Sequence, residues 1–176
     1  MPATINLTES DLFIIVRSFL MDVLGTDQIL RTQGNRVPQV TTDCVYMTPI
    51  VMPYLSTSRT DYTDTESDQT RSDSRTINWT IQLDCYGAQA MEWANTVATI
   101  MRTEYAYELL KGTGVTPLYA DEPRQASFIN AEEQWNARWM VDIHVQPDII
   151  ITTPQQFADQ LNIDRVEVDA SYPPGE

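Results

Sequence analysis

The sequence predicts an α+β fold, in which helices pack on one face of a largely antiparallel β-sheet and a long β-hairpin forms an arm. Two segments repeat apolar residues at three- and four-residue spacing, which indicates amphipathic helices. Two others alternate apolar with polar residues, which indicates strands with one buried face. The expected order is helix, strand, strand, helix, strand, strand, and it fits helices that cover one side of a sheet.

A single domain is expected over residues 1–176, because a chain of this length can bury a sizeable core. The hairpin arm is expected around 53–76, and a flexible tail at 171–176. Hydrophobic residues make up 42% of the chain, which excludes an intrinsically disordered protein.

The first expected element is a helix over 8–24. Thr8 can cap its start together with Asp11, three residues later, and Gly25 follows as a stop. Its apolar stripe consists of Leu12, Ile15, Val16, Phe19, Leu20 and Val23. The segment 28–38 lacks periodicity and is predicted to be a loop.

Two strands follow, at 39–55 and from 77 to 85. Because proline cannot donate to a ladder, Pro49 and Pro53 indicate that the first strand lies at an edge, bends, or ends near Thr48. The segment between them, 56–75, is rich in Ser and Thr and carries five acids and three arginines. A structureless connection this long is either functional or disordered. It is therefore a mobile solvated loop, or an arm that orders only when a partner is present.

The second half begins with a helix over 88–102, directly after Gly87. A shorter helical turn at 104–110, a short strand at 115–119 and a loop over 120–131 come next. The second clear strand is expected at 133–151, and Val166 and Val168 suggest a last short strand at 164–170.

Charge and hydropathy exclude several functions. The 25 acidic residues exceed the 11 basic ones, for a net charge of −14, and Lys111 is the only lysine. This argues against nucleic-acid binding by counterion release, which needs clustered basic residues. No apolar run approaches the roughly 20 residues that span a bilayer, and no secretory signal is visible, so we expect a soluble, unexported chain without a membrane partner.

The titratable residues predict no active site. His144 is the only histidine and is expected at the surface or an interface, on the polar side of its strand. Cys44 and Cys85 are expected to be buried apolar residues, because two thiols without further ligands do not hold zinc. We expect no catalytic residue, no cofactor and no enzyme activity.

Neither the acidic residues of 61–68 nor the glycines at 112 and 114 match a known ligand-binding motif. The acids of 61–68 resemble a carboxylate cluster, but they lack the glycine and terminal glutamate of a calcium loop. Gly112 and Gly114 follow a helix instead of preceding one, so they cannot cradle a phosphate. No metal site is expected.

One junction carries a family resemblance. The segment IQLDCYGAQA, at 81–90, leads from a strand through a glycine into the next helix, and EQWNAR, at 133–138, marks a later strand. Together they resemble the phage neck and tail-terminator proteins, in which the second strand of a long hairpin ends in an aromatic-Gly-x-x-Ala turn into a helix. The resemblance spans roughly 37–148 and continues in outline to the C-terminus.

The resemblance implies a structural virion protein of a tailed phage, assembled in the host cytoplasm and located in the neck or tail. It implies a homo-oligomeric ring, expected to be a hexamer, that caps the tail tube or joins it to the head connector. Tail-tube and head-connector or neck proteins are the implied partners. DNA would pass through without specific binding, because acids facing the channel repel phosphates. A terminator and a neighbouring neck ring both remain open.

Five residues are candidates for contact with partners or with other subunits. Arg59, Tyr62, Arg71 and Arg75 lie in the expected arm, and interfaces favour Tyr and Arg, although these residues can also serve only to solubilise a loop. Trp93 falls off the main stripe of its helix and is the candidate for an apolar contact between subunits.

Core is the expected position for all four tryptophans, Trp79, Trp93, Trp135 and Trp139, and a subunit contact is the alternative for Trp93. Two other functions remain as alternatives to a ring protein: a small acidic protein that binds a metal through the polar loop, and an acidic DNA mimic that blocks a basic protein.

Overall fold

The computed structural model describes residues 2–32, 43–65, 68–129 and 135–156. The larger sheet contains, in spatial order, β2 (Ile29–Arg31), β3 (Cys44–Val51), β6 (Trp79–Tyr86), β11 (Arg138–Pro147) and β7 (Val115–Ala120), with β8 (Arg124–Gln125) also paired to β11. The smaller sheet contains β1 (Thr4–Ile5), β12 (Ile150–Pro154), β5 (Gln69–Ser74) and β4 (Arg59–Asp64). Every pairing in the two sheets is antiparallel except the one between β2 and β3.

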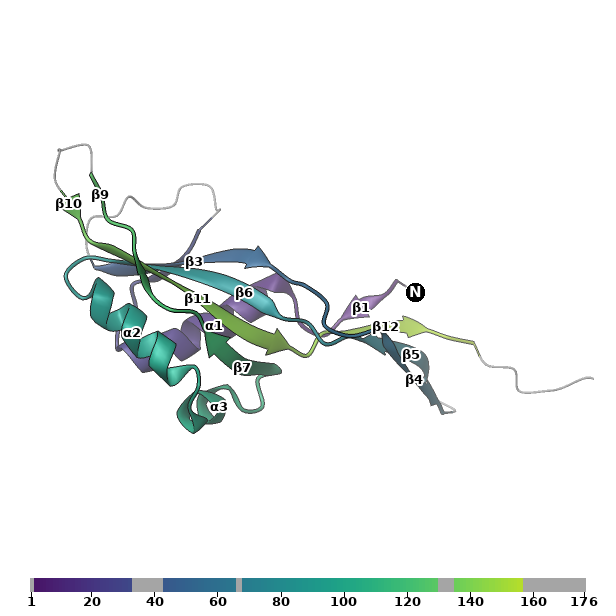
Figure 1. The fold of residues 1–176 in the computed structure, drawn as a ribbon. Helices are drawn as coiled ribbons and strands as arrows, with labels where there is room; N and C mark the ends of the chain where they lie inside the picture. Colours follow the sequence, from purple (N-terminus) through teal and green to yellow (C-terminus); the bar gives the residue numbers. More distant parts are fainter. Residues whose placement is uncertain (1, 33–42, 66–67, 130–134, 157–176) are drawn as a thin grey trace, which may run out of the picture.

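The helices α1 (Glu9–Leu24), α2 (Ala90–Ile100) and α3 (Glu104–Leu110) lie together on one side of the larger sheet (Figure 1). A further pair of short strands, β9 (Phe128–Ile129) and β10 (Trp135–Asn136), forms a separate ribbon. The predicted α+β class, with a largely antiparallel sheet and helices on one face, is confirmed.

The core lies between the helices and the larger sheet. The alternating residues of β6 that face it are at most 1% exposed: Trp79, Ile81, Leu83 and Cys85. Val141, Ile143 and Val145 stand opposite them on β11, and are also at most 1% exposed. Full burial of one such side chain contributes about 1.5–3 kcal/mol, so this strand pair anchors the fold.

The first helix begins and ends as its sequence predicts. The Thr8 side chain accepts a hydrogen bond from the Asp11 N–H, and the Asp11 carboxylate accepts one from the Thr8 N–H at 2.9 Å. The hydrogen bonds that Thr8 donates lower the pKa of Asp11 from its usual value. At the other end Gly25 has φ 65°, and its N–H donates to the Met21 carbonyl.

Gly87, at the junction between β6 and α2, is required by close packing. Its φ is 97°, and a Cβ atom built on it would lie 2.9 Å from the Asp43 Cα. The Asp43 carboxylate also accepts a hydrogen bond from the Ala88 N–H at 3.0 Å, which holds the chain at this turn. The aromatic-glycine turn therefore has a structural cause, namely the close approach of the segment that leads into β3.

The long hairpin arm expected around 53–76 is confirmed, because the polar segment 56–75 forms two paired strands. Only the interpretation of that segment as a structureless connection is wrong. β4 and β5 pair from Arg59 opposite Ser74 to Asp64 opposite Gln69, and β5 pairs on its other side with β12. Cross-strand hydrogen bonds between Ser, Thr and Asp side chains, such as that from Thr60 to Asp73, favour this pairing. The smaller sheet projects from the body as an arm (Figure 1).

Several short strands lie where the sequence predicts loops. β2 falls within 28–38, and β8 and β9 fall within 120–131. The single strand expected at 133–151 is divided into β10, β11 and the start of β12, because β12 joins the other sheet. The expected strand at 164–170 and the expected tail at 171–176 lie outside the described residues. Within the described ranges, no helix is long and apolar enough to cross a membrane.

Candidate interaction surfaces

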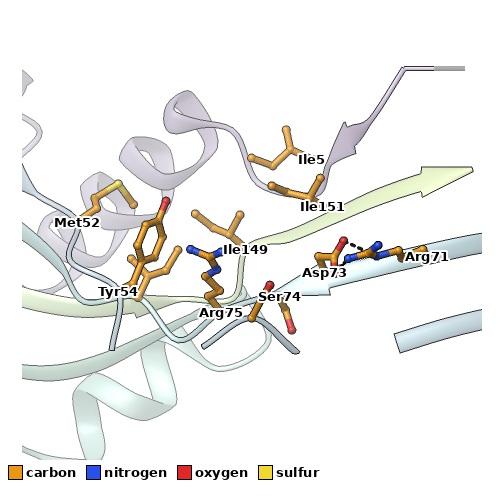
Figure 2. A pocket seen from close by; sticks show the side chains of 11 residues that line it. Ile5, Met52, Tyr54, Arg71, Asp73, Ser74, Arg75, Ile149 and Ile151 are labelled. Atoms are coloured by element: carbon orange, nitrogen blue, oxygen red, sulfur yellow. Dashed lines mark hydrogen bonds and ion pairs between the residues drawn. The ribbon is translucent and has the colours of Figure 1, made fainter. Parts of the chain in front are cut away.

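An apolar groove lies where the arm leaves the body. Ile5, Met52, Tyr54, Ile149 and Ile151 line a cavity of about 640 Å³, and we call it the junction groove. Figure 2 shows these side chains converging from β1, β12 and the segment after β3. Tyr54 is 64% exposed, Ile5 49% and Ile151 44%. A concentration of exposed apolar side chains in one place is typical of an interaction site.

Two arginines of the arm form the polar rim of this groove. The Arg75 guanidinium lies 4.8 Å from the centre of the Tyr54 ring, in a cation–π contact. Arg71 pairs with Asp73 through Nε and Oδ2, which are 2.9 Å apart. Hydrogen bonds from the Thr60 hydroxyl and then from Arg71 lower the pKa of Asp73. Arg71 is therefore neutralised, whereas Arg75 has no ion pair with another described residue.

The other two arm candidates lie on β4, at the outer edge of the smaller sheet. The Arg59 side chain is 77% exposed and pairs with Asp61 at 3.1 Å. Tyr62 is 60% exposed and stands opposite Arg71 in the strand register. The structure thus places Arg59, Tyr62 and Arg71 in one sheet and Arg75 directly after its strand β5. Of the four, only Arg71 and Arg75 line the groove.

Trp93 does not lie off the buried stripe of its helix, so that expectation is wrong. It is 8% exposed and belongs to the core, which leaves little of its ring for contact with another subunit. Trp79 is buried as predicted, and Trp139 is partly buried against the core. The side chain of Trp135 is outside the described part of the chain.

The sequence reasoning missed the apolar lining of the groove. One signal was available in the run Ile149, Ile150 and Ile151. Consecutive residues of a strand point to opposite faces, so a sheet with one buried face cannot bury all three. The sequence around Pro53 does not predict that Met52 and Tyr54 line a groove, because their exposure follows from the bend between the two sheets.

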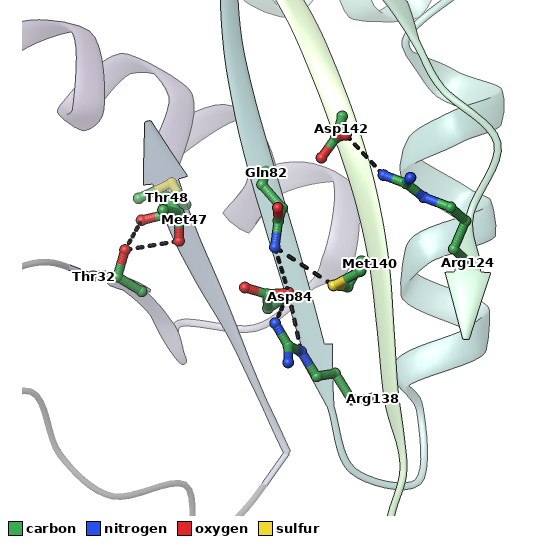
Figure 3. A network of polar contacts seen from close by, with 9 residues as sticks. All are labelled: Thr32, Met47, Thr48, Gln82, Asp84, Arg124, Arg138, Met140 and Asp142. Carbon is green, nitrogen blue, oxygen red and sulfur yellow. Dashed lines mark hydrogen bonds and ion pairs between the residues drawn. The ribbon is translucent and has the colours of Figure 1, made fainter. Parts of the chain in front are cut away.

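The helix-free face of the larger sheet carries a polar network instead of an apolar patch (Figure 3). Asp84 is 6% exposed and accepts hydrogen bonds from Arg138, at 2.8 Å and 3.1 Å, and from Gln82, at 3.0 Å. Arg124 pairs with Asp142 at 2.9 Å on the neighbouring strands. These charges are matched within the sheet, so the face is ordered by its own contacts.

His144 is buried on the same face, so the expectation of a surface position is wrong. It is 9% exposed, and its ring stacks on Tyr119 of β7 with 4.2 Å between centroids. Its Nδ1 lies 3.1 Å from the Thr80 hydroxyl. The Tyr119 ring covers the imidazole, which is why a position on the polar side of the strand is shielded from water.

Both cysteines are buried free thiols, as predicted. Burial raises the pKa of Cys85 to about 12, and it also raises the pKa of Cys44. A thiol that stays protonated is a poor nucleophile and a poor metal ligand. Within the described ranges, no group of three or more His, Cys, Asp or Glu residues could hold a metal ion.

The projecting arm and the exposed groove are features of an assembly protein, whose work is done by surfaces that contact other proteins. A family model of the phage neck terminator proteins matches residues 10–174, nearly the whole chain. The chain therefore belongs to the phage neck terminator protein family, and the resemblance predicted from the sequence is confirmed. A search of curated proteins found no match.

Membership of this family identifies a structural phage protein. Its place is the neck or tail of the virion, and it interacts with other tail or neck proteins.

Proposed function

We propose that the chain, acting as a single domain, assembles into a hexameric ring that ends the tail tube and joins it to the head connector. The observation that carries this proposal is the pairing of a projecting arm with an apolar groove at its base, in a member of the neck terminator family. A ring needs two different surfaces on each subunit, because its contacts run head to tail and close by rotation.

The arm and the groove can supply those two surfaces. Among the described residues β4 pairs with β5 alone, so in this part of the chain the arm presents a strand with one unpaired edge. An unpaired edge can accept a strand or loop of another chain through backbone hydrogen bonds. The groove offers exposed apolar area, with Tyr54 and Arg75 as residue types that dominate contact energies.

The net charge supports a channel for DNA. Each copy carries a charge of −14, and a ring multiplies the resulting field around its central opening. Lys111 is the only lysine, and the arginines are scattered along the sequence, so the chain offers few basic side chains to hold DNA phosphates. The genome can then move through the ring without specific binding.

Purified tail tubes provide the test. After the chain is added to them, we expect electron micrographs to show extra density at one end of each tube. Tyr54→Ser should weaken this capping, because it removes an exposed groove side chain that the proposal places at the contact between neighbouring ring subunits. Ile14→Ser is the matched control, since Ile14 is 65% exposed on α1 and lies outside the groove. Density along the whole tube, or none at all, would contradict the proposal.

A further inference from the structure

We propose that the junction groove of each copy is occupied by the C-terminal segment 157–176 of a neighbouring copy. This inference rests on the proposed ring and names the partner of the groove. Three observations carry it: the chemistry of the groove, the chemistry of the segment, and the place where the described chain ends.

The groove has an apolar floor and a charged rim of Arg71, Asp73 and Arg75, in which the pairing of Arg71 with Asp73 leaves the charge of Arg75 unmatched among the described residues. Ile5, Tyr54 and Ile151 contribute exposed apolar surface, and a volume of about 640 Å³ can hold several side chains. Arg75 stands at the rim with no ion pair to another described residue. A segment that carries both apolar and acidic side chains is therefore complementary to this groove.

The C-terminal segment has that composition. Residues 157–176 contain five acids and one arginine. The apolar residues among them are spread along the segment as Phe157, Leu161, Ile163, Val166 and Val168. Within 164–170 the two valines alternate with Arg165, Glu167 and Asp169, so an extended segment would separate an apolar face from a charged one.

The path of β12 directs this segment away from its own groove. Ile150, at the groove end of the strand, stands opposite Ser74, whereas Pro154 stands opposite Thr70 near the turn of the arm. The Gln155 N–H then donates to the Gln69 carbonyl, so the described chain ends at the far end of the arm. Figure 1 shows β12 running outward from the body.

The segment is long enough to extend well beyond the end of β12. Residues 157–163 can span about 23 Å when extended, at roughly 3.3 Å per residue, before the alternating valines begin. A return to the segment's own groove would instead require the chain to reverse along a strand whose two sides are already paired, to β1 and to β5. The neighbouring copy is therefore the favoured acceptor.

Cross-linking of the full-length chain tests the inference. The double variant Ile151→Cys and Val168→Cys places one thiol in the groove and one in the segment, and a short bifunctional thiol reagent can link them. The native Cys44 and Cys85 are buried and stay unreactive under mild conditions. We expect a ladder of covalent multimers on a denaturing gel.

A mixture of two single variants shows whether the groove that receives the segment belongs to another copy. Chains with Ile151→Cys alone, mixed with chains that carry Val168→Cys alone, should give covalent dimers of the two. The pair Ile14→Cys and Val168→Cys is the matched control, because Ile14 is exposed outside the groove, and it should give none. A link formed only inside one chain would overturn the inference.

Charge reversal gives an independent readout. Arg75→Glu should raise the concentration at which rings dissociate by about tenfold, because the rim would then repel the acidic segment. Lys111→Glu makes the same change in charge on an exposed side chain outside the groove, and should leave that concentration nearly unchanged. Equal effects of the two substitutions would contradict a specific role of Arg75.

The result also separates this inference from the proposed ring. Intact rings without the expected cross-link overturn the inference and leave the ring standing. An unsubstituted chain that never forms rings overturns both.

Discussion

Asp84 and Arg138 show how single residues hold the sheet together. Their side chains are 8% and 28% exposed, which makes them the most buried ion pair among the described residues. Both lie on the helix-free face, where each would be costly to leave alone in a partly desolvated site. Their pairing joins β6 to β11, the two central strands, so the contact acts at the middle of the fold.

Removal of the Asp84 carboxylate should destabilise the chain. Asp84→Ala leaves the Arg138 charge without its partner, and we expect the free energy of unfolding to fall by roughly 2–3 kcal/mol, the low end for a buried pair because Arg138 is partly exposed. Urea denaturation measures this. The double variant Asp84→Ala and Arg138→Met should recover part of the loss. No recovery would show that the pair itself contributes little.

The Cys85 thiol should be inert in the native chain. Because its folded pKa is about 12, only about one thiol in ten thousand is ionised at pH 8. We expect a thiol-reactive dye at this pH to label the cysteines rapidly only after unfolding in urea. Rapid labelling of the folded chain would contradict the burial of both thiols.

The same pKa shift gives a pH dependence of stability. The unfolded thiol has the ordinary pKa of a cysteine, 9.0, whereas burial raises the pKa of the folded thiol to about 12. Between these values the folded state binds more protons, so the contribution of Cys85 to stability falls as pH rises.

At the scale of elements, the structure explains which patterns the sequence could predict. The helices and the central strands follow from periodicity, because a stripe or an alternation is a local property of the chain. The sequence also predicts the hairpin arm at 53–76, but not its pairing with β12, since β5 and β12 pair across about 80 positions of sequence, as the contact between Ser72 and Thr152 shows. A polar segment such as 56–75 lacks the alternating apolar pattern of a strand, so its pairing is evident only once its distant partner strand is known.

The turn at Gly87 makes a prediction about an element boundary. Gly87→Ala would be strained at φ 97° and would displace Asp43 from its hydrogen bond with Ala88, so we expect a loss of about 3 kcal/mol. Gly112→Ala is the control, because Gly112 also has a positive φ, 78°, but has open space around it, and it should cost about 1 kcal/mol. Thermal or urea unfolding compares them. If both substitutions lower the free energy of unfolding equally, the positive φ alone causes the loss, and the close approach of Asp43 adds nothing.

The arm should resist proteolysis in the isolated chain. Arg71 lies on β5, which is paired on both sides, so trypsin should cleave after it slowly. Asp73→Pro removes a backbone donor from this strand, and cleavage after Arg71 should then be at least about tenfold faster. Rapid cleavage of the unsubstituted chain would instead support an arm that orders only on assembly.

At the scale of the whole molecule, the family and the fold class could be predicted from the sequence, but the groove could not. The glycine junction and the two alternating strands are local signals, and they were sufficient for both predictions. The groove brings together Ile5, Tyr54 and Ile151, which are far apart in the sequence. Its position depends on the bend between the two sheets. The sequence indicates Arg71 and Arg75 by residue type alone, and only the packing of the arm against the body places them at the groove.

The central claim is that identical copies close into a ring. The most direct measurement is the mass of the purified chain's particles in solution, taken together with rotational averages from electron micrographs. We expect particles of about 120 kDa, six times the 20.1 kDa of one copy, with six-fold averages around an open centre. A chain that remains at 20.1 kDa at every concentration, or that forms open filaments, would contradict a closed hexameric ring.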